Sequence, residues 1–381
     1  MSSGSGSGKG RRPGTQGWVI GRAVGAPIVL APSWLIAAVV LTVIFAPTVQ
    51  VRAPRLGALT YVVALGFVVL LFVSELVHEL AHGLVARARG QVVHEFAITL
   101  WGGHTAFGGV APTPATSALV AVVGPLANLV IAAVCWVAAQ AVPPDGLGGL
   151  LLYAGAFSNG FVGIFNLVPG LPLDGGRVLE ALIWRATGDR HRGSVIAGWA
   201  GRVVAIAVVA WAVLLPLASG ASPDLYTIVW AALIGSFLWS GATGAIAGAK
   251  TGRAVTAITI TAVGLPATVV GADAMLADAD RARGVAGVDD VVVLSPDGRP
   301  AAYVDRAAAA AVAPEHRAST PVVAVAVVLP VGSVVDASLE GAELVHAVGQ
   351  ATRSSQVVVA VRAGRVVALV RAIDVIAALR S

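Results

Sequence analysis

Long apolar stretches constrain this chain more than any other feature of its sequence. Six of them reach the roughly 20 apolar residues that an α-helix needs to cross a bilayer. The composition agrees, because 57% of the 381 residues are hydrophobic, only 12% are charged, and the mean hydropathy is +0.85. Soluble globular proteins rarely have such a composition. We therefore predict a polytopic α-helical membrane protein with spans at residues 32–48, 59–85, 116–142, 148–168, 194–217 and 225–247.

The charged residues divide the chain into two parts. The first 250 residues carry 8 acidic and 14 basic side chains, whereas the remaining 131 residues carry 12 and 11. This shift predicts a flexible leader at residues 1–16, a membrane domain at residues 17–250 and a soluble domain at residues 251–381. Residues 17–30 alternate loosely in polarity and predict a short surface hairpin before the first span. Basic and aromatic residues do not cluster, so nucleic-acid binding is the weaker interpretation of the net charge of +5.

Basic residues in the loops predict the orientation of the chain, because cytoplasmic loops carry an excess of lysine and arginine. Arg52 and Arg55 lie in the opposite set of loops and are the exception. Both termini are therefore predicted to be cytoplasmic, in a multi-pass protein of the cell membrane. The basic residues that support this orientation are Lys9, Arg11, Arg12, Arg22, Arg87, Arg89, Arg177, Arg185, Arg190, Arg192, Lys250 and Arg253.

The segment His78-Glu79-Leu80-Ala81-His82 lies near the end of the second apolar stretch. Residues four apart share one face of a helix, so both imidazoles can bind one metal ion, and zinc suits such ligands. Glu79 beside them can act as a general base on a water molecule. Ionisable side chains in so apolar a segment are costly, which favours a functional role. Glu75 on the same face either supports a ligand histidine or faces lipid or water.

A catalytic zinc site needs a third protein ligand, and Asp174 is the best candidate. The segment 166–177 ends the fourth span on the side of the membrane where His78 and His82 lie. The alternative is an ordinary turn residue, because Asp-Gly-Gly is common turn chemistry.

Two further polar features have two interpretations each. Asn128 lies in Gly124-Pro125-Leu126-Ala127-Asn128 within the third span, and it contacts either the substrate or another helix. The stretch 94–107 is β-prone and too polar to span a bilayer. It is either an edge strand that pairs with an extended substrate or an ordinary cytoplasmic loop.

Together these elements resemble the site-2 protease family of intramembrane zinc metalloproteases, in its compact branch. The matching segments are 78–82, 124–128 and 166–176, and the resemblance covers roughly residues 17–250. The resemblance implies that His78, His82 and Asp174 bind one zinc ion, that Glu79 is the catalytic base, and that Asn128 and Asn166 lie near the substrate. It also implies cleavage of transmembrane segments of other proteins, such as a membrane-bound transcription factor, a sigma factor or an anti-sigma factor.

The tail resembles the pair of CBS modules that this branch often carries. Residues 290–305 and 356–370 both follow a strand–turn–strand pattern, and a repeat at roughly 70 residues suggests two copies of one α/β module. The resemblance implies binding of an adenine nucleotide, with Asp374 as the ribose-binding acid and Asp305 as a second candidate. Arg371 departs from the usual small hydroxyl residue, so a structural or dimerising pair is the alternative.

The sequence thus predicts a zinc metalloendopeptidase for regulated intramembrane proteolysis, with a regulatory CBS tail and a possible homodimer through that tail. Two alternatives are a membrane transporter or channel with regulatory CBS domains and a proteolytically inactive scaffold of the family. The paired histidines with Glu79 between them favour the protease, because an ion pathway does not need that arrangement.

Overall fold

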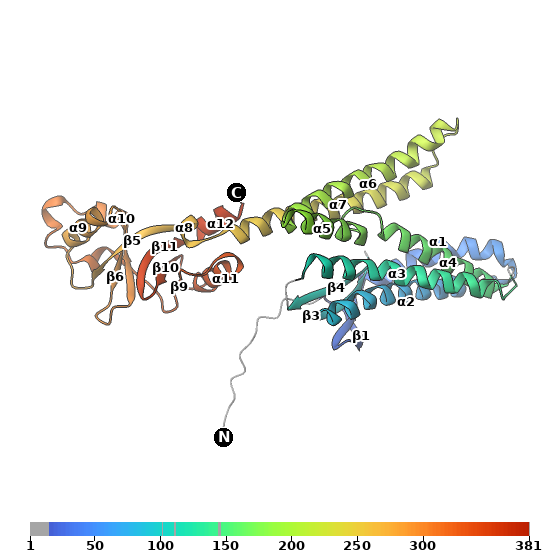
Figure 1. Cartoon of the computed structure of the whole chain (residues 1–381), viewed down its shortest axis with the longest axis horizontal. Helices are drawn as coiled ribbons and strands as arrows, with labels where there is room; N and C mark the ends of the chain where they lie inside the picture. Colours follow the sequence, from blue (N-terminus) through green and yellow to red (C-terminus); the bar gives the residue numbers. More distant parts are fainter. Residues whose placement is uncertain (1–14, 101, 110–111, 144–145, 381) are drawn as a thin grey trace, which may run out of the picture. The chain divides into compact units, whose positions relative to one another are not determined.

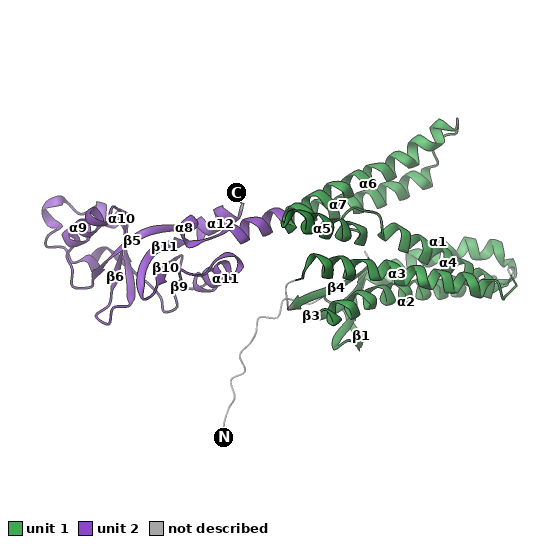
Figure 2. Cartoon of the chain, in the orientation of Figure 1, with its two compact units in different colours: residues 1–247 green, residues 248–381 purple. Residues whose placement is uncertain are grey.

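The computed structural model describes residues 15–100, 102–109, 112–143 and 146–380. The predicted leader, residues 1–16, lies outside the described residues except for its last two. The chain forms two compact units, Met1–Ala247 and Gly248–Ser381, which we name unit 1 and unit 2 (Figure 2). Each unit has hydrophobic cores of its own.

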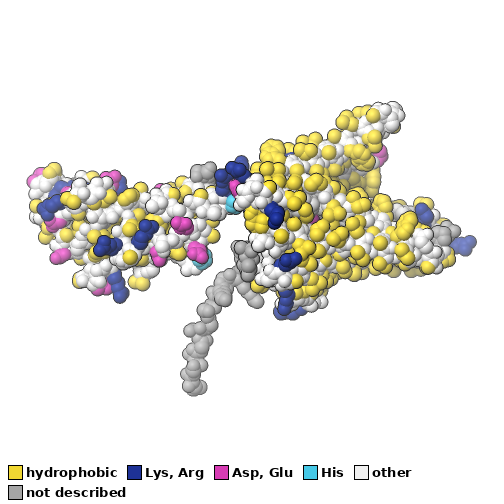
Figure 3. All heavy atoms as spheres, viewed as in Figure 1, with side chains coloured by type: hydrophobic (Ala, Val, Ile, Leu, Met, Phe, Trp, Pro, Cys, Tyr) yellow, Lys and Arg dark blue, Asp and Glu magenta, His cyan; other side chains and the backbone are white. Residues whose placement is uncertain are grey.

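Six helices in the described part of unit 1 are long and apolar enough to cross a membrane, as the sequence predicts. Their outer faces are apolar, and Figure 3 shows hydrophobic side chains over most of the visible face of this unit. Val62, Phe157 and Val203 are 63, 76 and 63% exposed. Such a surface suits a bilayer rather than water, which confirms the polytopic α-helical fold class. The six helices are α1 (Ser33–Arg52), α2 (Leu59–Ala88), α3 (Pro114–Ala139), α4 (Leu147–Asn166), α6 (Arg190–Ala218) and α7 (Leu225–Ala257) (Figure 1).

Unit 1 also contains a four-stranded sheet with the strand order β1-β2-β3-β4. The first two strands form the predicted hairpin at residues 17–30. The last two form an antiparallel hairpin between α2 and α3, so the stretch 94–107 is a strand pair rather than an irregular loop. β4 is an edge strand. The strands are β1 (Trp18–Ala23), β2 (Ala26–Leu30), β3 (Gln91–Thr99) and β4 (Gly102–Gly109).

This sheet packs closely against α2. Phe96 on β3 is fully buried, and a Cβ atom at Gly83 would collide with its ring. Gly83 directly follows His82, so the absence of a side chain there lets β3 lie against the turn that carries the histidines. The same packing brings β4 alongside Glu75 and Glu79.

Unit 2 has the two-copy α/β architecture that the sequence predicts. Each copy is a helix, an antiparallel strand pair and a second helix. β5 (Gly264–Gly271) pairs with β6 in parallel and with β11 in antiparallel orientation, and it joins the two copies in one sheet with the order β8-β7-β6-β5-β11-β10-β9. The first copy contains α9 (Leu276–Ala286), β6 (Asp290–Leu294), β7 (Pro300–Val304) and α10 (Arg306–Ala310); the second contains α11 (Gly341–Ala351), β10 (Val357–Arg362), β11 (Arg365–Arg371) and α12 (Ala372–Arg380).

The seven-stranded sheet curls on itself. Its two edge strands, β8 (Ala326–Val328) and β9 (Val334–Asp336), are joined by five residues, so the ends of these strands lie at most about 22 Å apart. In a flat sheet, six strand spacings would separate the edges by about 29 Å. Curling brings the two copies face to face around a shared apolar core, which includes Val292 and Val359, both fully buried.

Candidate metal centre

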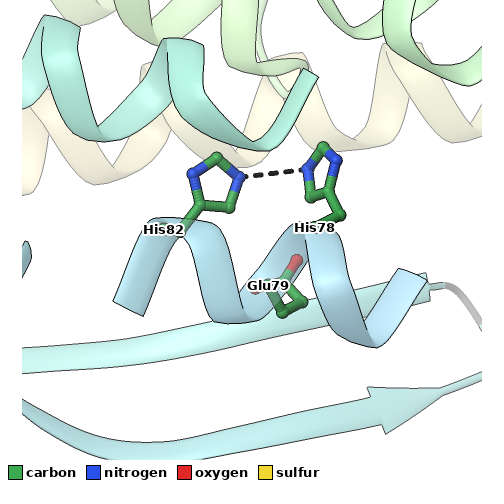
Figure 4. A group of neighbouring side chains, drawn as sticks. All are labelled: His78, Glu79 and His82. Carbon is green, nitrogen blue, oxygen red and sulfur yellow. Dashed lines mark hydrogen bonds between the residues drawn. The ribbon is translucent and has the colours of Figure 1, made fainter. Parts of the chain in front are cut away.

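His78 and His82 point to the same side of α2, as their spacing of four residues predicts (Figure 4). Glu79 points toward the strands of the sheet. The exposed fractions of His78, Glu79 and His82 are only 4, 6 and 7%. Burying three ionisable side chains in one apolar helix is costly unless they are hydrogen-bonded or bind a metal ion.

The ligand atoms of His78, His82 and Asp174 converge on one point. The two histidine Nε2 atoms are 3.0 Å apart. Oδ2 of Asp174 lies 3.1 Å from Nε2 of His78 and 3.3 Å from Nε2 of His82. Ligands about 2.1 Å from a tetrahedral zinc ion lie about 3.4 Å from one another, so these separations fit zinc. The structure therefore brings together the three predicted ligands, and their role as ligands stays a prediction.

A tight loop between α4 and α5 (Asp174–Thr187) positions Asp174. The backbone N–H of Leu171 in this loop donates to a carbonyl of α6 at 3.0 Å. Gly201 on α6 packs against the backbone of Leu171, where a Cβ atom would collide. Asp174 then forms the first residue of α5, so the Asp-Gly-Gly segment begins a helix instead of forming an isolated turn.

The surroundings of the Asp174 carboxyl group lower its pKa. Burial raises its pKa, but hydrogen bonds and charges from His78 and His82 lower the pKa more strongly and hold it below the usual range of an aspartate. An ionised carboxylate is the form that binds a metal ion.

Oxygen acceptors hold the second ring nitrogen of each histidine. His82 Nδ1–H donates to the backbone carbonyl of Val120 on α3 at 2.6 Å, and His78 Nδ1–H donates to Oδ1 of Asn128. When a metal ion is bound, these bonds would select the tautomer in which each Nε2 lone pair faces the common point. Both rings are therefore oriented for a metal ion by groups on α3.

Asn128 belongs to a buried network of polar side chains. Its Nδ2 donates to Oδ1 of Asn159 on α4 at 2.9 Å and to Oγ of Ser74 on α2 at 3.2 Å. Asn128 is only 2% exposed. Of its two predicted roles, the structure therefore favours hydrogen bonding between helices. Sequence reasoning missed Asn159, although a lone amide in the apolar fourth span is the same kind of signal as Asn128.

Glu79 lies between the histidines and strand β4. Thr105 Oγ1 on β4 donates to Glu79 Oε2 at 2.5 Å. One carboxylate oxygen of Glu79 and one ring nitrogen of each histidine all lie within 4.8 Å of one another. A carboxylate at that distance can exchange a proton with a water molecule held between these groups. Thr105 gave no signal in the sequence, because its contact with Glu79 depends on how β4 packs.

Gly124 on α3 preserves the space in front of the histidines. A Cβ atom at this position would lie 2.6 Å from Nε2 of His78 and would also collide with Nε2 of His82. The ligand atoms thus face a backbone that carries no side chain. Any residue larger than glycine would enter the space that fits the metal ion.

A cavity of about 600 Å³ opens beside these residues. Asn166, at the end of α4, lines it, and its place near the substrate stays a prediction. Strand β4 forms one wall, and Glu75 accepts a hydrogen bond from the backbone N–H of Gly103 there at 2.8 Å. Glu75 therefore holds the edge strand rather than His78. The lining also includes the aromatic side chains of Phe161, Phe165 and Phe237 and the charged side chains of Arg177, Glu180 and Arg190.

The two acids predicted to bind a nucleotide lie in unit 2. Asp305 is the N-cap of α10, and its Oδ1 accepts from the backbone N–H groups of Ala307 and Ala308 at 2.8 and 3.1 Å. Asp374 lies in the first turn of α12, and its buried Oδ2 has no hydrogen-bond partner among the described residues. The nucleotide role of both acids stays a prediction.

Comparisons with known proteins place this site in context. Residues 146–210 match the model of Peptidase family M50. Rip3 of Mycobacterium tuberculosis, which is named as a zinc metalloprotease, is 39% identical over 180 residues, covering 46% of this chain and 45% of Rip3. The Synechocystis protein sll0528 carries a similar name and is 32% identical over 229 residues, covering 58% of each chain. The solved site-2 protease from Methanocaldococcus jannaschii covers 60% of this chain and 94% of its own at 22% identity, with a TM-score of 0.41.

The fold and the site define a polytopic membrane protein with a buried centre suited to zinc. The family model and the curated relatives confirm its resemblance to the site-2 protease family, which the segments 78–82, 124–128 and 166–176 predict. This chain spans about half the length of these curated relatives.

Proposed function

We propose that this protein is an intramembrane zinc endopeptidase. The observation that carries the proposal is the convergence of Nε2 of His78, Nε2 of His82 and Oδ2 of Asp174 within 3.3 Å, with Glu79 beside them. When bound, zinc would supply Lewis acidity that activates water and polarises a peptide carbonyl. This arrangement favours peptide hydrolysis over a transporter, because it combines metal ligands with a general base.

Each residue around the centre has a distinct role in this proposal. Glu79 takes a proton from the attacking water and returns it to the nitrogen of the leaving amine. Thr105 donates to Glu79 and holds the carboxylate in place. Asn128 and the carbonyl of Val120 orient the two histidines through their Nδ1–H groups.

The proposed substrate is a transmembrane segment of another membrane protein. The hydrogen bonds of an α-helix protect its peptide bonds, so the segment must unwind locally before attack. An unwound segment can pair with the outer edge of β4, which lines the same cavity as the histidines. Substrates of this kind include membrane-bound transcription factors, sigma factors and anti-sigma factors. The positive loops favour cytoplasmic termini and a centre near the cytoplasmic side.

Cleavage of a labelled transmembrane peptide in detergent micelles tests the proposal. We expect Glu79→Gln to keep zinc and to lose about 10³-fold in kcat, since general base catalysis contributes about 10²- to 10⁴-fold. Asp224→Asn is the matched control, because Asp224 is an exposed acid that caps the start of α7. Full activity of Glu79→Gln would exclude the proposed base.

For unit 2 we propose a regulatory role in which an adenine nucleotide binds beside Asp374, with Asp305 as the second acid. The buried Oδ2 of Asp374, which has no hydrogen-bond partner among the described residues, supports this, because a ribose hydroxyl would satisfy it. Calorimetric titration of the full chain with AMP and with ATP tests it. Binding that is lost in Asp374→Asn supports the proposal. The absence of binding to the unmodified chain would favour a structural or dimerising pair.

A further inference from the structure

An arginine lies inside the apolar surface formed by α6 and α7. Arg202 is eight residues, about 12 Å, from the predicted start of the fifth span. A charged side chain at such a position is costly and is normally paired. Among the described residues, no carboxylate lies within 4.0 Å of Arg202. The acids nearest in the sequence are engaged elsewhere, since Glu180 pairs with Arg190 at 2.9 Å and Asp189 caps α6.

Close contact between α6 and α7 places this arginine at their seam. Gly198, one turn before Arg202, packs against α7, where a Cβ atom would lie 2.6 Å from Ile246 and 3.2 Å from the carbonyl of Ala242. Arg202 lies on the same face of α6 as Gly198 because the two are four residues apart. Its guanidinium group therefore reaches α7, where Nη2 donates to Thr243 Oγ1 at 3.1 Å.

Two tryptophans hold the guanidinium group. Its central carbon lies 4.7 Å from the ring centroid of Trp199 on α6 and 4.9 Å from that of Trp239 on α7. Stacking of this kind stabilises the cation and fixes its direction. Both rings are about half exposed, at 55 and 43%, so they lie on the surface that faces lipid. Tryptophan is enriched where a bilayer changes from hydrocarbon to headgroups.

The Arg202 guanidinium group has more N–H donors than the described residues have acceptors for it. An arginine carries five N–H groups. Thr243 accepts one of them, and no second acceptor contacts the Nη atoms among the described residues. A cation in an apolar surface is costly while its donors lack acceptors, which indicates that an acceptor outside the chain completes the site. That acceptor must be anionic, because it also has to neutralise the charge.

We propose that Arg202, with Thr243, Trp199 and Trp239, binds the phosphate group of an anionic membrane lipid at the α6–α7 seam. Arginine matches phosphate with a planar pair of N–H donors. A charge at this depth draws lipid headgroups toward it, and the two indole rings supply apolar surface for the start of the acyl chains. The proposal concerns the lipid-facing side of unit 1 and does not rest on the proposed catalytic activity.

The chain contains a matched control for this site. Arg190 also stacks on a tryptophan, at 5.5 Å from the ring centroid of Trp184, but the carboxylate of Glu180 neutralises it. Both arginines stack on tryptophan, but only Arg202 lacks a carboxylate partner among the described residues. A difference between the two variants would therefore show that the unpaired charge binds the lipid. Arg190→Gln is therefore expected to keep the bound lipid, whereas Arg202→Gln is expected to lose it.

The test measures lipid retained by the full-length protein. The chain is purified from nanodiscs that contain phosphatidylglycerol or only phosphatidylcholine, and retained lipid is counted by native mass spectrometry. We expect wild type and Arg190→Gln to retain phosphatidylglycerol, Arg202→Gln to retain about tenfold less, and no variant to retain phosphatidylcholine. Equal retention of phosphatidylglycerol by Arg202→Gln and wild type would overturn the proposal.

A second measurement on wild type alone guards against a misfolded variant. Phosphatidylglycerol added to delipidated protein in neutral micelles is expected to raise the Tm, and phosphatidylcholine is not. Equal effects of the two lipids would overturn the proposal. Inorganic phosphate is added in a third arm. A similar rise in Tm with phosphate alone would contradict a lipid as the ligand and identify a free anion instead.

Discussion

Unit 1 and unit 2 distribute polar side chains in opposite ways. In unit 1 the outer surface is apolar, and the buried polar side chains lie mostly in one network around the candidate metal centre. In unit 2 the interior is built of valine, leucine, isoleucine and alanine, while most charges lie on the surface. In the described part of unit 2, the buried acid Asp290 pairs with Arg306 at 2.7 Å, in contrast to Asp374, whose Oδ2 has no partner. Among the described residues of unit 1, the buried polar ones are Thr60, Ser74, His78, Glu79, His82, Asn128 and Asn159.

A buried polar group therefore indicates different things in the two units, because lipid surrounds unit 1 and water surrounds unit 2. A lipid-facing helix gains nothing from a polar residue unless another helix, water or a ligand satisfies it, so each such residue suggests a site. A water-facing unit buries an acid for structural reasons when an arginine neutralises it. The following predictions test this contrast, from the largest expected effect to the smallest.

Gly124→Ala is expected to weaken zinc binding by about 100-fold, because overpacking of a rigid site typically costs about 1–3 kcal/mol. The added Cβ atom would occupy the space in front of the two Nε2 atoms. Competition with a zinc chelator measures the change. Gly160→Ala on α4 is the control, since its Cβ atom would make only an ordinary contact with Ala132 at 3.8 Å. Equal zinc affinity in both variants would show that Gly124 does not face the metal.

Asn128→Leu is expected to weaken zinc binding by about 10- to 100-fold, the usual effect of removing a group that orients a ligand histidine. The substitution leaves Nδ1–H of His78 without its acceptor. Asn128→Asp keeps an oxygen at that position and is expected to lose less. The chelator competition that measures Gly124→Ala applies here. If Asn128→Leu bound zinc like wild type, the buried network would be structural only.

Asp290→Asn is expected to destabilise unit 2 by about 2 kcal/mol, within the range for hydrogen bonds to charged groups. Asp290 is 3% exposed and accepts two bonds from Arg306, at 2.9 and 2.7 Å. Urea denaturation, monitored by hydrogen exchange of the β6 amides, measures the loss of stability. Asp297→Asn is the surface control, because the Asp297 side chain is 59% exposed. Zinc affinity should not change in either variant. A loss of zinc affinity in Asp290→Asn would contradict the purely structural role of this buried acid in unit 2.

Arg281→Ala is expected to change the stability of unit 2 by less than about 0.5 kcal/mol, because exposed ion pairs contribute little. Arg281 pairs with Asp278 at 3.1 Å, and the two side chains are 74 and 44% exposed. Urea denaturation measures the effect. If Arg281→Ala lost as much stability as Asp290→Asn, solvent exposure would not explain the difference between the Arg281–Asp278 pair and the Arg306–Asp290 pair.

The sequence predicted the parts of the fold that depend on local pattern. The six spans follow from apolar runs, and the pair of histidines follows from a spacing of four on one helix. The two strand pairs of unit 2 follow from a repeated strand–turn–strand pattern. The prediction of Asp174 as a ligand uses topology rather than local pattern, because two chain segments are predicted to end at the same side of the membrane.

Contacts that depend on how distant segments pack could not be predicted. Thr105 reaches Glu79 only because β3 packs on Gly83, and Val120 reaches His82 only because α3 packs on α2. A threonine and a backbone carbonyl carry no distinct signal in a sequence. The curl of the sheet in unit 2 likewise depends on pairing between its two copies. Such features depend on packing, which one sequence does not reveal.

The central claim is that residues from α2 and α5 hold one zinc ion between them. Elemental analysis of zinc in the purified full-length protein tests it most directly, with Asp174→Ala compared with wild type and with Asp224→Ala as the surface control. We predict one zinc ion per chain in wild type and in Asp224→Ala, and almost none in Asp174→Ala after dialysis against a chelator. A full complement of zinc in Asp174→Ala would contradict the account.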